Sequence, residues 1–360
     1  MNHFIQHIQS LPDLMGTLLP RFVAEAGRHV DTLPRRLHLI GCGDSYFAAL
    51  ATELAFESLA RIPTEAQNAM TFSRYAAEFA PLDADTWVIG ISVSGGVSRT
   101  IEGLVRARAR GAQTWAITSS EQTPIARVAE RVLITQVPDL PNAAGVLVPG
   151  SRSYYASLLM LYALALQLAD LAGADTHTWR KQLADAVTWA EQTIQYNNKA
   201  AADWVARTLE AREFVLCGSG PHFATASFGA AKIIEACGDP ATPQDVEEWA
   251  HLQYFCKAAD TPTFLITMRE RDASRVAEVR TAMQAIGRRV IEVSPAVEAE
   301  LACPACPELL APLISGLPLM LFAAHRAERL GEPYFRGFSG GRSVEGGGGI
   351  SRIRTSEIVA

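Results

Sequence analysis

The second half of the chain carries four polar residues whose types suit proton-transfer chemistry. They are Lys232, Glu235, Glu248 and His251. A partly desolvated carboxylate can take up and return a proton, and an imidazole titrates near neutral pH. Lys232 and Glu235, three residues apart on one helix face, are by themselves more typical of a solvated ion pair. A single histidine is likewise more often structural, so these residues alone leave both interpretations open.

Two turns in the first half carry glycines and hydroxyl groups where a strand gives way to a helix. Gly-Cys-Gly-Asp-Ser spans 41–45, and Ser-Val-Ser-Gly-Gly-Val-Ser spans 92–98. Free backbone amides at the positive end of a helix bind phosphate or another oxyanion, although glycines and serines also simply turn the chain and cap helices. Two such turns in one domain favour an anion site. The residues assigned to it are Gly43, Asp44, Ser45, Ser92, Val93, Ser94, Gly95 and Val97.

Elements that can position these residues follow from alternating apolar and helical patterns. In the first half the apolar runs are 36–40, 87–92, 113–118 and 131–135. Helical spacing covers 45–59 and again the stretch up to Arg110, and one long helix is predicted from Ser151 to about Gln195. Near-continuous apolar strands separated by helices are typical of a parallel sheet covered on both faces.

The second half repeats this pattern. Strands predicted at 215–217, 260–267 and 288–293 match those at 39–41, 85–92 and 113–118, with an offset of about 175 residues. The sequence therefore predicts an α/β fold of two tandem domains, each a doubly wound, flavodoxin-like, mostly parallel sheet. The predicted ranges are a helical lead-in at 1–34, domains at 35–195 and 196–344, and a tail at 345–360. Thr-Met-Arg-Glu replaces the serine–glycine turn at 267–270, so an anion cradle is expected in the first half only.

Composition limits the possible partners. The chain has 360 residues, 49% of them hydrophobic, and a net charge of −6, which suits two packed domains and argues against a nucleic-acid surface. The N-terminus lacks the pattern of a signal peptide, and the apolar run 158–168 is too short to span a bilayer. Only Cys303 and Cys306 among six cysteines lie close in sequence, without a second pair. We therefore predict a cytoplasmic protein without a metal site that binds neither nucleic acid nor membrane.

Over most of its length the chain resembles the tandem SIS-domain sugar isomerases, namely the isomerase part of glucosamine-6-phosphate synthase and the fructosamine-phosphate deglycases. Cys-Gly-Asp-Ser at 42–45 is similar to the family's Cys-Gly-Thr-Ser, and Ser-Val-Ser-Gly-Gly at 92–96 to its Ser-Gln-Ser-Gly-Glu. Ser151 looks like the serine that approaches the sugar hydroxyls. The residues that match the family's lysine, catalytic glutamate, the glutamate before the histidine, and catalytic histidine are Lys232, Glu235, Glu248 and His251.

The resemblance implies a phosphosugar aldose–ketose isomerase that works through a cis-enediol and needs no cofactor. It implies that Glu235 transfers the proton, that His251 opens the sugar ring, and that Lys232 stabilises the enolate oxygen or holds Glu235. It also implies a homodimer in which the histidine enters the neighbouring subunit's site. The alternatives are a ketosamine-6-phosphate (fructosamine) deglycase, an isomerase of a non-phosphorylated or sulfonated sugar, and a non-catalytic sugar-phosphate sensor.

Several residues depart from the family pattern. Asp44 stands where the family has threonine, and Val97 replaces a phosphate-binding threonine, so a phosphate is expected to be held differently or replaced by another group. No glutaminase domain is expected ahead of the first domain, and the tail from residue 345 has no lysine for an imine. Arg352 or Arg354 on the glycine hinge 346–349 could close over a ligand, and a plain solvated tail is the alternative.

Overall fold

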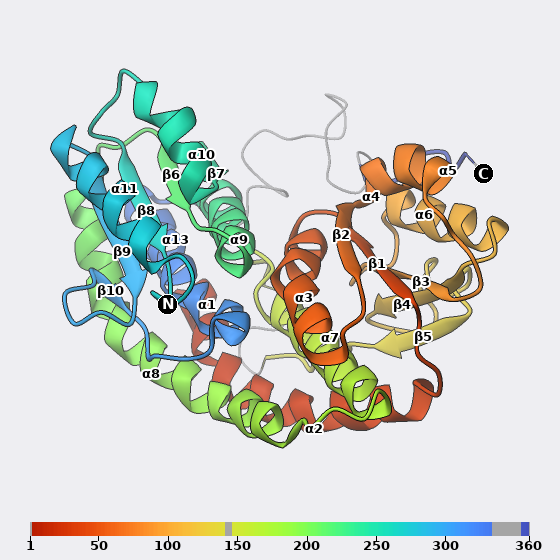
Figure 1. Cartoon of the computed structure of the whole chain (residues 1–360). Helices are drawn as coiled ribbons and strands as arrows, with labels where there is room; N and C mark the ends of the chain where they lie inside the picture. The colour runs from red at the N-terminus through yellow and green to blue at the C-terminus, as the bar shows by residue number, and fades with distance from the viewer. Residues whose placement is uncertain (1, 141–145, 333–353, 360) are drawn as a thin grey trace. The chain divides into compact units, whose positions relative to one another are not determined.

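The computed structural model describes residues 2–140, 146–332 and 354–359. The chain forms two compact units, each containing one sheet (Figure 1). The unit that we call the first domain comprises Asp13–Asp139, Arg152–Ala184 and the C-terminal stretch from Gly341. The second domain comprises Met1–Pro12, Leu140–Ser151 and Asp185–Gly340. The two sheets fall within the ranges 35–195 and 196–344, whose limits stay predictions.

The first domain is built around five strands. They are β1 (Arg36–Gly41), β2 (Thr64–Asn68), β3 (Thr86–Ile91), β4 (Gln113–Thr118) and β5 (Arg131–Ile134). Its helical segments, one of them the π-helical turn η1, are α2 (Leu11–His29), α3 (Asp44–Ala60), α4 (Ala69–Thr71), η1 (Phe72–Ala76), α5 (Ala77–Phe79), α6 (Ser98–Ala109) and α7 (Arg152–Leu171).

These strands form one parallel sheet in the order β2-β1-β3-β4-β5. α3 packs against β1, β2 and α7, while α6 packs with β3, β4 and η1. Trp87 of β3 and Trp115 of β4 stack with ring centroids 4.4 Å apart, which adds a specific contact to the apolar burial of the two strands. The prediction of a parallel, doubly wound sheet is confirmed for this half.

The second domain has a further five strands. They are β6 (Phe214–Cys217), β7 (Ala241–Gln244), β8 (Pro262–Ile266), β9 (Arg289–Ser294) and β10 (Leu301–Ala302). Its helical segments, of which η2 and η3 are 3₁₀ turns, are α1 (His3–Gln9), α8 (His177–Arg207), α9 (Pro221–Cys237), α10 (Val246–His251), η2 (Gln253–Phe255), α11 (Ala273–Ala285), η3 (Glu308–Leu310), α12 (Pro312–Ser315) and α13 (Leu317–Leu330). The start of α8, up to Ala184, belongs to the first domain.

The second sheet has the same topology as the first. Its order is β10-β9-β8-β6-β7, again all parallel. The glycine turns repeat in detail: Gly43 has φ 56° and ψ −131°, and Gly220 has φ 54° and ψ −128°. At both Gly41 and Gly218 a Cβ atom would lie under 3.0 Å from the helix that follows, so each turn requires glycine. The predicted duplication of one fold is confirmed.

One helix prediction is wrong. The helix expected from Ser151 to about Gln195 is two helices, because the chain breaks between the end of α7 at Leu171 and the start of α8 at His177. Gly173 lies in this break with φ 78°, a left-handed conformation that ends a helix readily. α8 then continues twelve residues beyond the predicted end, to Arg207.

α7 also corrects the membrane argument, which rested on a shorter apolar run. The helix has 20 residues and is long and apolar enough to cross a bilayer by length and composition. Of its most apolar window, 83% is buried inside the protein. This burial is typical of a core helix, and α7 packs along α3 in the first domain.

Candidate active site

The two predicted anion-binding turns follow neighbouring strands at the carboxyl end of the first sheet. The turn 41–45 follows β1, the turn 92–98 follows β3, and these strands are neighbours with Ile40 opposite Gly90. In the order β2-β1-β3-β4-β5 this is the point where the chain reverses the direction in which it adds strands. Open α/β sheets bind ligands at that point, beyond the carboxyl ends of the strands. We call these two turns together the anion cradle.

Gly95 shapes the second turn of the cradle. Its φ is 65°, and a Cβ atom at this position would lie 2.3 Å from Cβ of Thr123. The Gly95 amide donates to the Ser92 carbonyl at 3.0 Å, and its own carbonyl accepts from the Ile125 amide at 3.0 Å. The turn is therefore held against the next loop through its backbone, which leaves the serine side chains available for other contacts.

The hydroxyl groups of the predicted site differ in their surroundings. Ser92 is buried, and its Oγ has no hydrogen-bond partner among the described residues. Ser94 is exposed, and its Oγ accepts from the Gly96 amide at 3.5 Å. Ser45 is half-buried in the first turn of α3. A buried hydroxyl without a partner is uncommon in folded proteins, so Ser92 is a strong candidate for a ligand contact.

The remaining residues predicted for the anion site also differ in their surroundings. Val93 and Val97 are half-buried and place no polar side-chain atom there. Asp44 begins α3 and lies near Tyr154 of α7, whose pKa is raised well above its usual value by burial, with Tyr155 and Asp44 adding to the effect. Ser151 directly precedes α7, and its buried Oγ has no partner among the residues that the structure describes.

Two arginines bring positive charge to the cradle: Arg354, which the sequence analysis named as a residue that could close over a ligand, and Arg99, which it did not single out. Burial raises the pKa of the Cys42 thiol, and the charges of Arg354 and Arg99 act in the opposite direction. Both guanidinium groups therefore lie near the turn 41–45. Arg99 is in the first turn of α6 and could not be told from an ordinary surface arginine by spacing. Arg352 and the glycine hinge 346–349 lie outside the described residues.

The end of the chain lies along α6, held by hydrogen bonds. The Ser356 amide donates to Ser98 Oγ at 2.8 Å, and Arg99 Nη2 donates to Ser356 Oγ at 3.0 Å. The Val359 amide donates to Glu102 at 2.9 Å. The Glu102 side chain is fully buried and also pairs with Arg74 and Arg99. These contacts hold the segment 354–359 against α6, and its residues remain exposed to solvent.

Lys232 and Glu235 meet on α9 of the second domain. Lys232 Nζ lies 2.7 Å from Glu235 Oε2, and the lysine side chain is fully buried while the glutamate is 26% exposed. The ammonium group also lies 4.9 Å from the centre of the Phe228 ring. The solvated ion pair favoured by spacing alone is therefore wrong for Lys232. A buried cation instead fixes a carboxylate that remains accessible from one side.

His251 lies apart from this pair in the described interactions. It ends α10, its side chain is 65% exposed, and its Nε2 lies 3.2 Å from Oε1 of Glu247. Glu247 in turn pairs with Arg275 at 2.6 Å. Glu248 is exposed in the first turn of the same helix. The structure therefore brings Lys232 and Glu235 together and places His251 on the surface.

Comparison with known proteins identifies the first half. The SIS domain family matches residues 33–167. This part of the chain is similar to a SIS domain. Over 308 residues the chain is 29% identical to the glutamine–fructose-6-phosphate aminotransferase of Gloeobacter violaceus. The alignment covers 82% of this chain and 49% of that protein. The chain spans about half the length of the curated relatives that it matches.

Solved structures extend the likeness to both halves. A glucosamine-6-phosphate deaminase from Thermotoga maritima aligns with a TM-score of 0.76 at 17% identity, covering 92% of this chain and 96% of that one. The C-terminal domain of glucosamine-fructose-6-phosphate aminotransferase from Francisella tularensis aligns with a TM-score of 0.79 at 16% identity. The alignment covers 92% of this chain and 97% of that one. The predicted tandem SIS fold and the resemblance to the isomerase part of the aminotransferase are thus confirmed.

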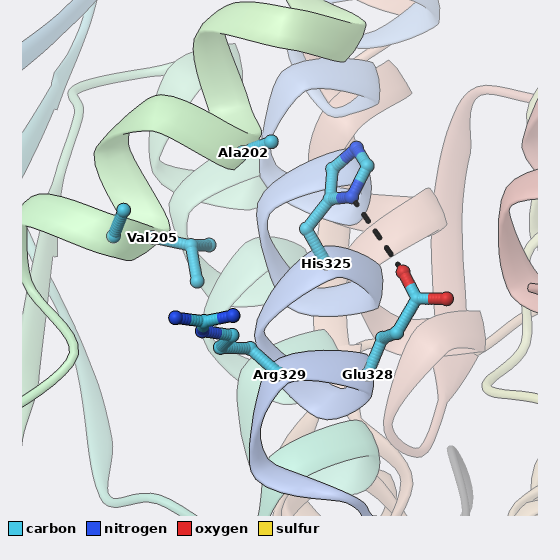
Figure 2. Close-up of a pocket in the computed structure, with 6 residues that line it drawn as sticks. Ala202, Val205, His325, Glu328 and Arg329 are labelled. Atoms are coloured by element: carbon cyan, nitrogen blue, oxygen red, sulfur yellow. Dashed lines mark ion pairs between the residues drawn. The ribbon is translucent and has the colours of Figure 1, made fainter.

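A separate hollow of about 520 Å³ lies in the second domain between α8 and α13 (Figure 2). His325 Nδ1 faces Glu328 Oε2 there at 4.0 Å, and His325 Nε2 lies 3.0 Å from Asn198 Oδ1. Burial lowers the pKa of His325. The residues lining the hollow are Ala202, Val205, Ala206, His325, Glu328 and Arg329. None of them belongs to the predicted site.

The cradle offers a prediction on stability. We expect Gly95→Ala to lower the free energy of unfolding by about 2–4 kcal/mol, because the new methyl group would overlap Thr123 and because φ is positive. Gly96→Ala is the matched control, since nothing lies within 4 Å of its Cβ position. Urea unfolding of both variants measures the difference. Equal stability of the two would contradict this account of the turn.

Proposed function

We propose that the protein is a phosphosugar aldose–ketose isomerase that works through a cis-enediol intermediate. The observation that carries the proposal is the buried Lys232 ammonium group 2.7 Å from a partly exposed Glu235 carboxylate. Such a carboxylate is held in one orientation and remains accessible to a substrate. Its location in a chain with a SIS domain and an anion cradle makes an anionic sugar the substrate class.

Each proposed role matches the chemistry of one group. Glu235 removes the proton from the carbon beside the carbonyl and returns it to the neighbouring carbon. Lys232 orients Glu235 and stabilises negative charge on the enediolate oxygen. His251 delivers a proton to the ring oxygen when a cyclic sugar opens. The cradle holds the charged substituent away from the reacting carbons, so the same contact serves substrate and product.

The charges near the cradle support an anionic substituent despite Asp44 and Val97. Arg99 and Arg354 act on Cys42 of the first turn, and the amides of the second turn lie at the N-terminus of α6. Arg354, a helix N-terminus and Arg99, which also pairs with Glu102, together favour a phosphate against the carboxylate of Asp44. We propose that Arg99 and Arg354 replace the phosphate-binding threonine that Val97 lacks.

We also propose that the active protein is a homodimer in which His251 completes the partner's site. The segment after His251 exposes large apolar side chains: Leu252 is 57% exposed, Tyr254 43% and Phe255 74%. Apolar side chains gathered in one exposed stretch are typical of an interaction surface. This exposed stretch supports a subunit contact at His251, which is the acid in the proposed reaction.

A panel of sugars tests the reaction. It contains aldose phosphates, ketose phosphates, ketosamine phosphates, and unphosphorylated and sulfonated sugars, each incubated in D₂O and followed by NMR and mass spectrometry. We expect interconversion of an aldose phosphate and its ketose, with deuterium at the carbon beside the carbonyl. Release of a free amine would instead identify a deglycase, and saturable binding without turnover would identify a sensor.

Ser94→Ala tests the cradle. We expect KM for the anionic substrate to rise more than kcat falls, because the contact to the anion persists through the reaction. Steady-state kinetics measure the two constants, and Ser58→Ala, at an exposed serine on α3, is the control. A fall in kcat without a change in KM would mean that Ser94 acts on the reacting atoms and not on the anion.

A further inference from the structure

The second domain has its own switch point, between the neighbouring strands β6 and β8. The turn after β6 has the backbone conformation of the cradle turn, yet it leads into His222 where the first domain has Ser45. The turn after β8 leads to Asp272, close to the position of Val97 in the repeat. The ligand position of the fold is therefore kept in the second domain, and its side chains differ completely.

Three side chains meet at this switch point. One ligand atom each of His222, Asp272 and Glu308 lies within 4.8 Å of the other two. His222 Nε2 faces Glu308 Oε1 at 3.9 Å, while the other Glu308 oxygen pairs with Arg271. Two atoms bound to one ion at about 2.0–2.2 Å each lie at most about 4.4 Å apart. The group therefore needs only a small inward movement to hold an ion.

Burial makes this group costly without a ligand. His222 is fully buried and Glu308 is 5% exposed. His222 Nδ1 and Asp272 Oδ2 are both buried and have no hydrogen-bond partner among the described residues. Unpaired buried polar atoms cost about 1–3 kcal/mol each, and two carboxylates beside each other repel. A bound cation would offset both costs.

The protonation states fit the same ligand. Burial lowers the pKa of His222 to about 4, so its imidazole is neutral and keeps a nitrogen lone pair at neutral pH. Burial raises the pKa of Asp272 and of Glu308, although Arg271 acts in the opposite direction on Glu308. The Met268 amide donates to His222 Nε2 at 3.3 Å, so Nε2 carries the lone pair of the neutral ring, and an ion bound there replaces this hydrogen bond.

We propose that His222, Asp272 and Glu308 bind one divalent transition-metal ion. One imidazole nitrogen and two carboxylate oxygens suit Zn²⁺, Mn²⁺ or Fe²⁺, whereas Mg²⁺ prefers a shell of oxygen atoms alone. Asp272 is half-buried, so an ion can reach the group from its side. The ion joins the first turn of α9 to the segments before α11 and at η3, and α9 also carries Lys232 and Glu235. This site uses none of the residues assigned to isomerisation.

Metal binding to the full chain is measured first. The protein is stripped with a chelator, and titration with Zn²⁺ and separately with Mn²⁺ is followed by calorimetry and by metal analysis after dialysis. We expect one tightly bound ion per chain and a raised thermal midpoint, because an ion that binds only the folded state stabilises it. Absence of binding at millimolar metal would overturn the proposal.

Variants locate the ion. Asp272→Asn and Glu308→Gln should each weaken binding at least about 100-fold, since each removes a charged ligand. Asp260→Asn and Glu298→Gln, at exposed acids of the same domain, should bind as the unchanged protein does. Unchanged metal binding by Asp272→Asn and Glu308→Gln would refute the site. If that pair fails to fold, anomalous scattering from Mn²⁺-soaked crystals decides: a peak at these three side chains supports the proposal, and a peak elsewhere, such as beside Cys303 and Cys306, overturns it.

Discussion

Glu235→Gln is expected to lower kcat by about 10²–10⁴-fold while KM changes little. The amide keeps the size and polarity of the carboxylate and can still accept a hydrogen bond from Lys232, which now lies 2.7 Å from it. It cannot accept and return a proton. The substrate contacts proposed for the cradle involve other residues, so we expect binding to be preserved and chemistry to be lost.

Two measurements separate this role from a structural one. Deuterium exchange at the carbon beside the carbonyl should fall as far as kcat does, because both need the same proton transfer. Glu210→Gln, at an exposed glutamate paired with Arg289, is the control and should leave both rates unchanged. If Glu235→Gln kept its exchange rate, another group would be the base, and the assignment of Glu235 would be wrong.

The sequence predicted those parts of the fold that depend on local patterns. Apolar runs located β1, β3, β4, β5, β6, β8 and β9, since buried parallel strands are almost continuously apolar. It missed β2, β7 and β10 as strands. β2 reads Thr-Glu-Ala-Gln-Asn, and β10 has two residues. Edge strands are paired on one side only, so their burial and composition carry a weak signal.

The candidate site was predictable only in part, because some of its features depend on tertiary structure. The cradle turns could be found because glycine is required there by the backbone, as Gly41 and Gly95 show. The burial of Lys232 could not, since an i, i+3 pair has the same spacing whether solvated or buried. The contacts of Arg99 with the segment 354–359 join residues more than 250 positions apart. Tertiary structure alone creates such contacts.

The two halves illustrate how one fold diverges. Gly43 and Gly220 keep nearly the same backbone angles, so both turns aim a helix N-terminus at the switch point. In the first domain the two turns carry the hydroxyl groups of Ser45, Ser92 and Ser94, with Asp44 among them. In the second, His222 and Asp272 place a neutral imidazole and a carboxylate at the same location. The backbone constraint is thus retained while the side chains differ, and the ligands that we propose for the two positions are of opposite charge.

His251→Asn is expected to lower kcat on cyclic sugars by about 10²-fold and to recover partly on substrates that are already open-chain. Asparagine lacks a group that can donate a proton and be recharged near neutral pH, and only ring opening requires it. Comparing a substrate that cyclises with one that cannot measures this difference. Arg275→Gln is the control for the surface network around Glu247, and it should affect both substrates alike.

Mixing subunits tests whether His251 acts in the partner's site. Glu235→Gln and His251→Asn chains should each be nearly inactive on cyclic sugars. After exchange at equal concentrations, half of the dimers contain one chain of each kind, and one of their two sites has both intact residues, so about a quarter of the unmutated activity should return. Native mass spectrometry verifies the exchange. Verified mixed dimers without recovered activity would place His251 and Glu235 in a site formed by a single chain.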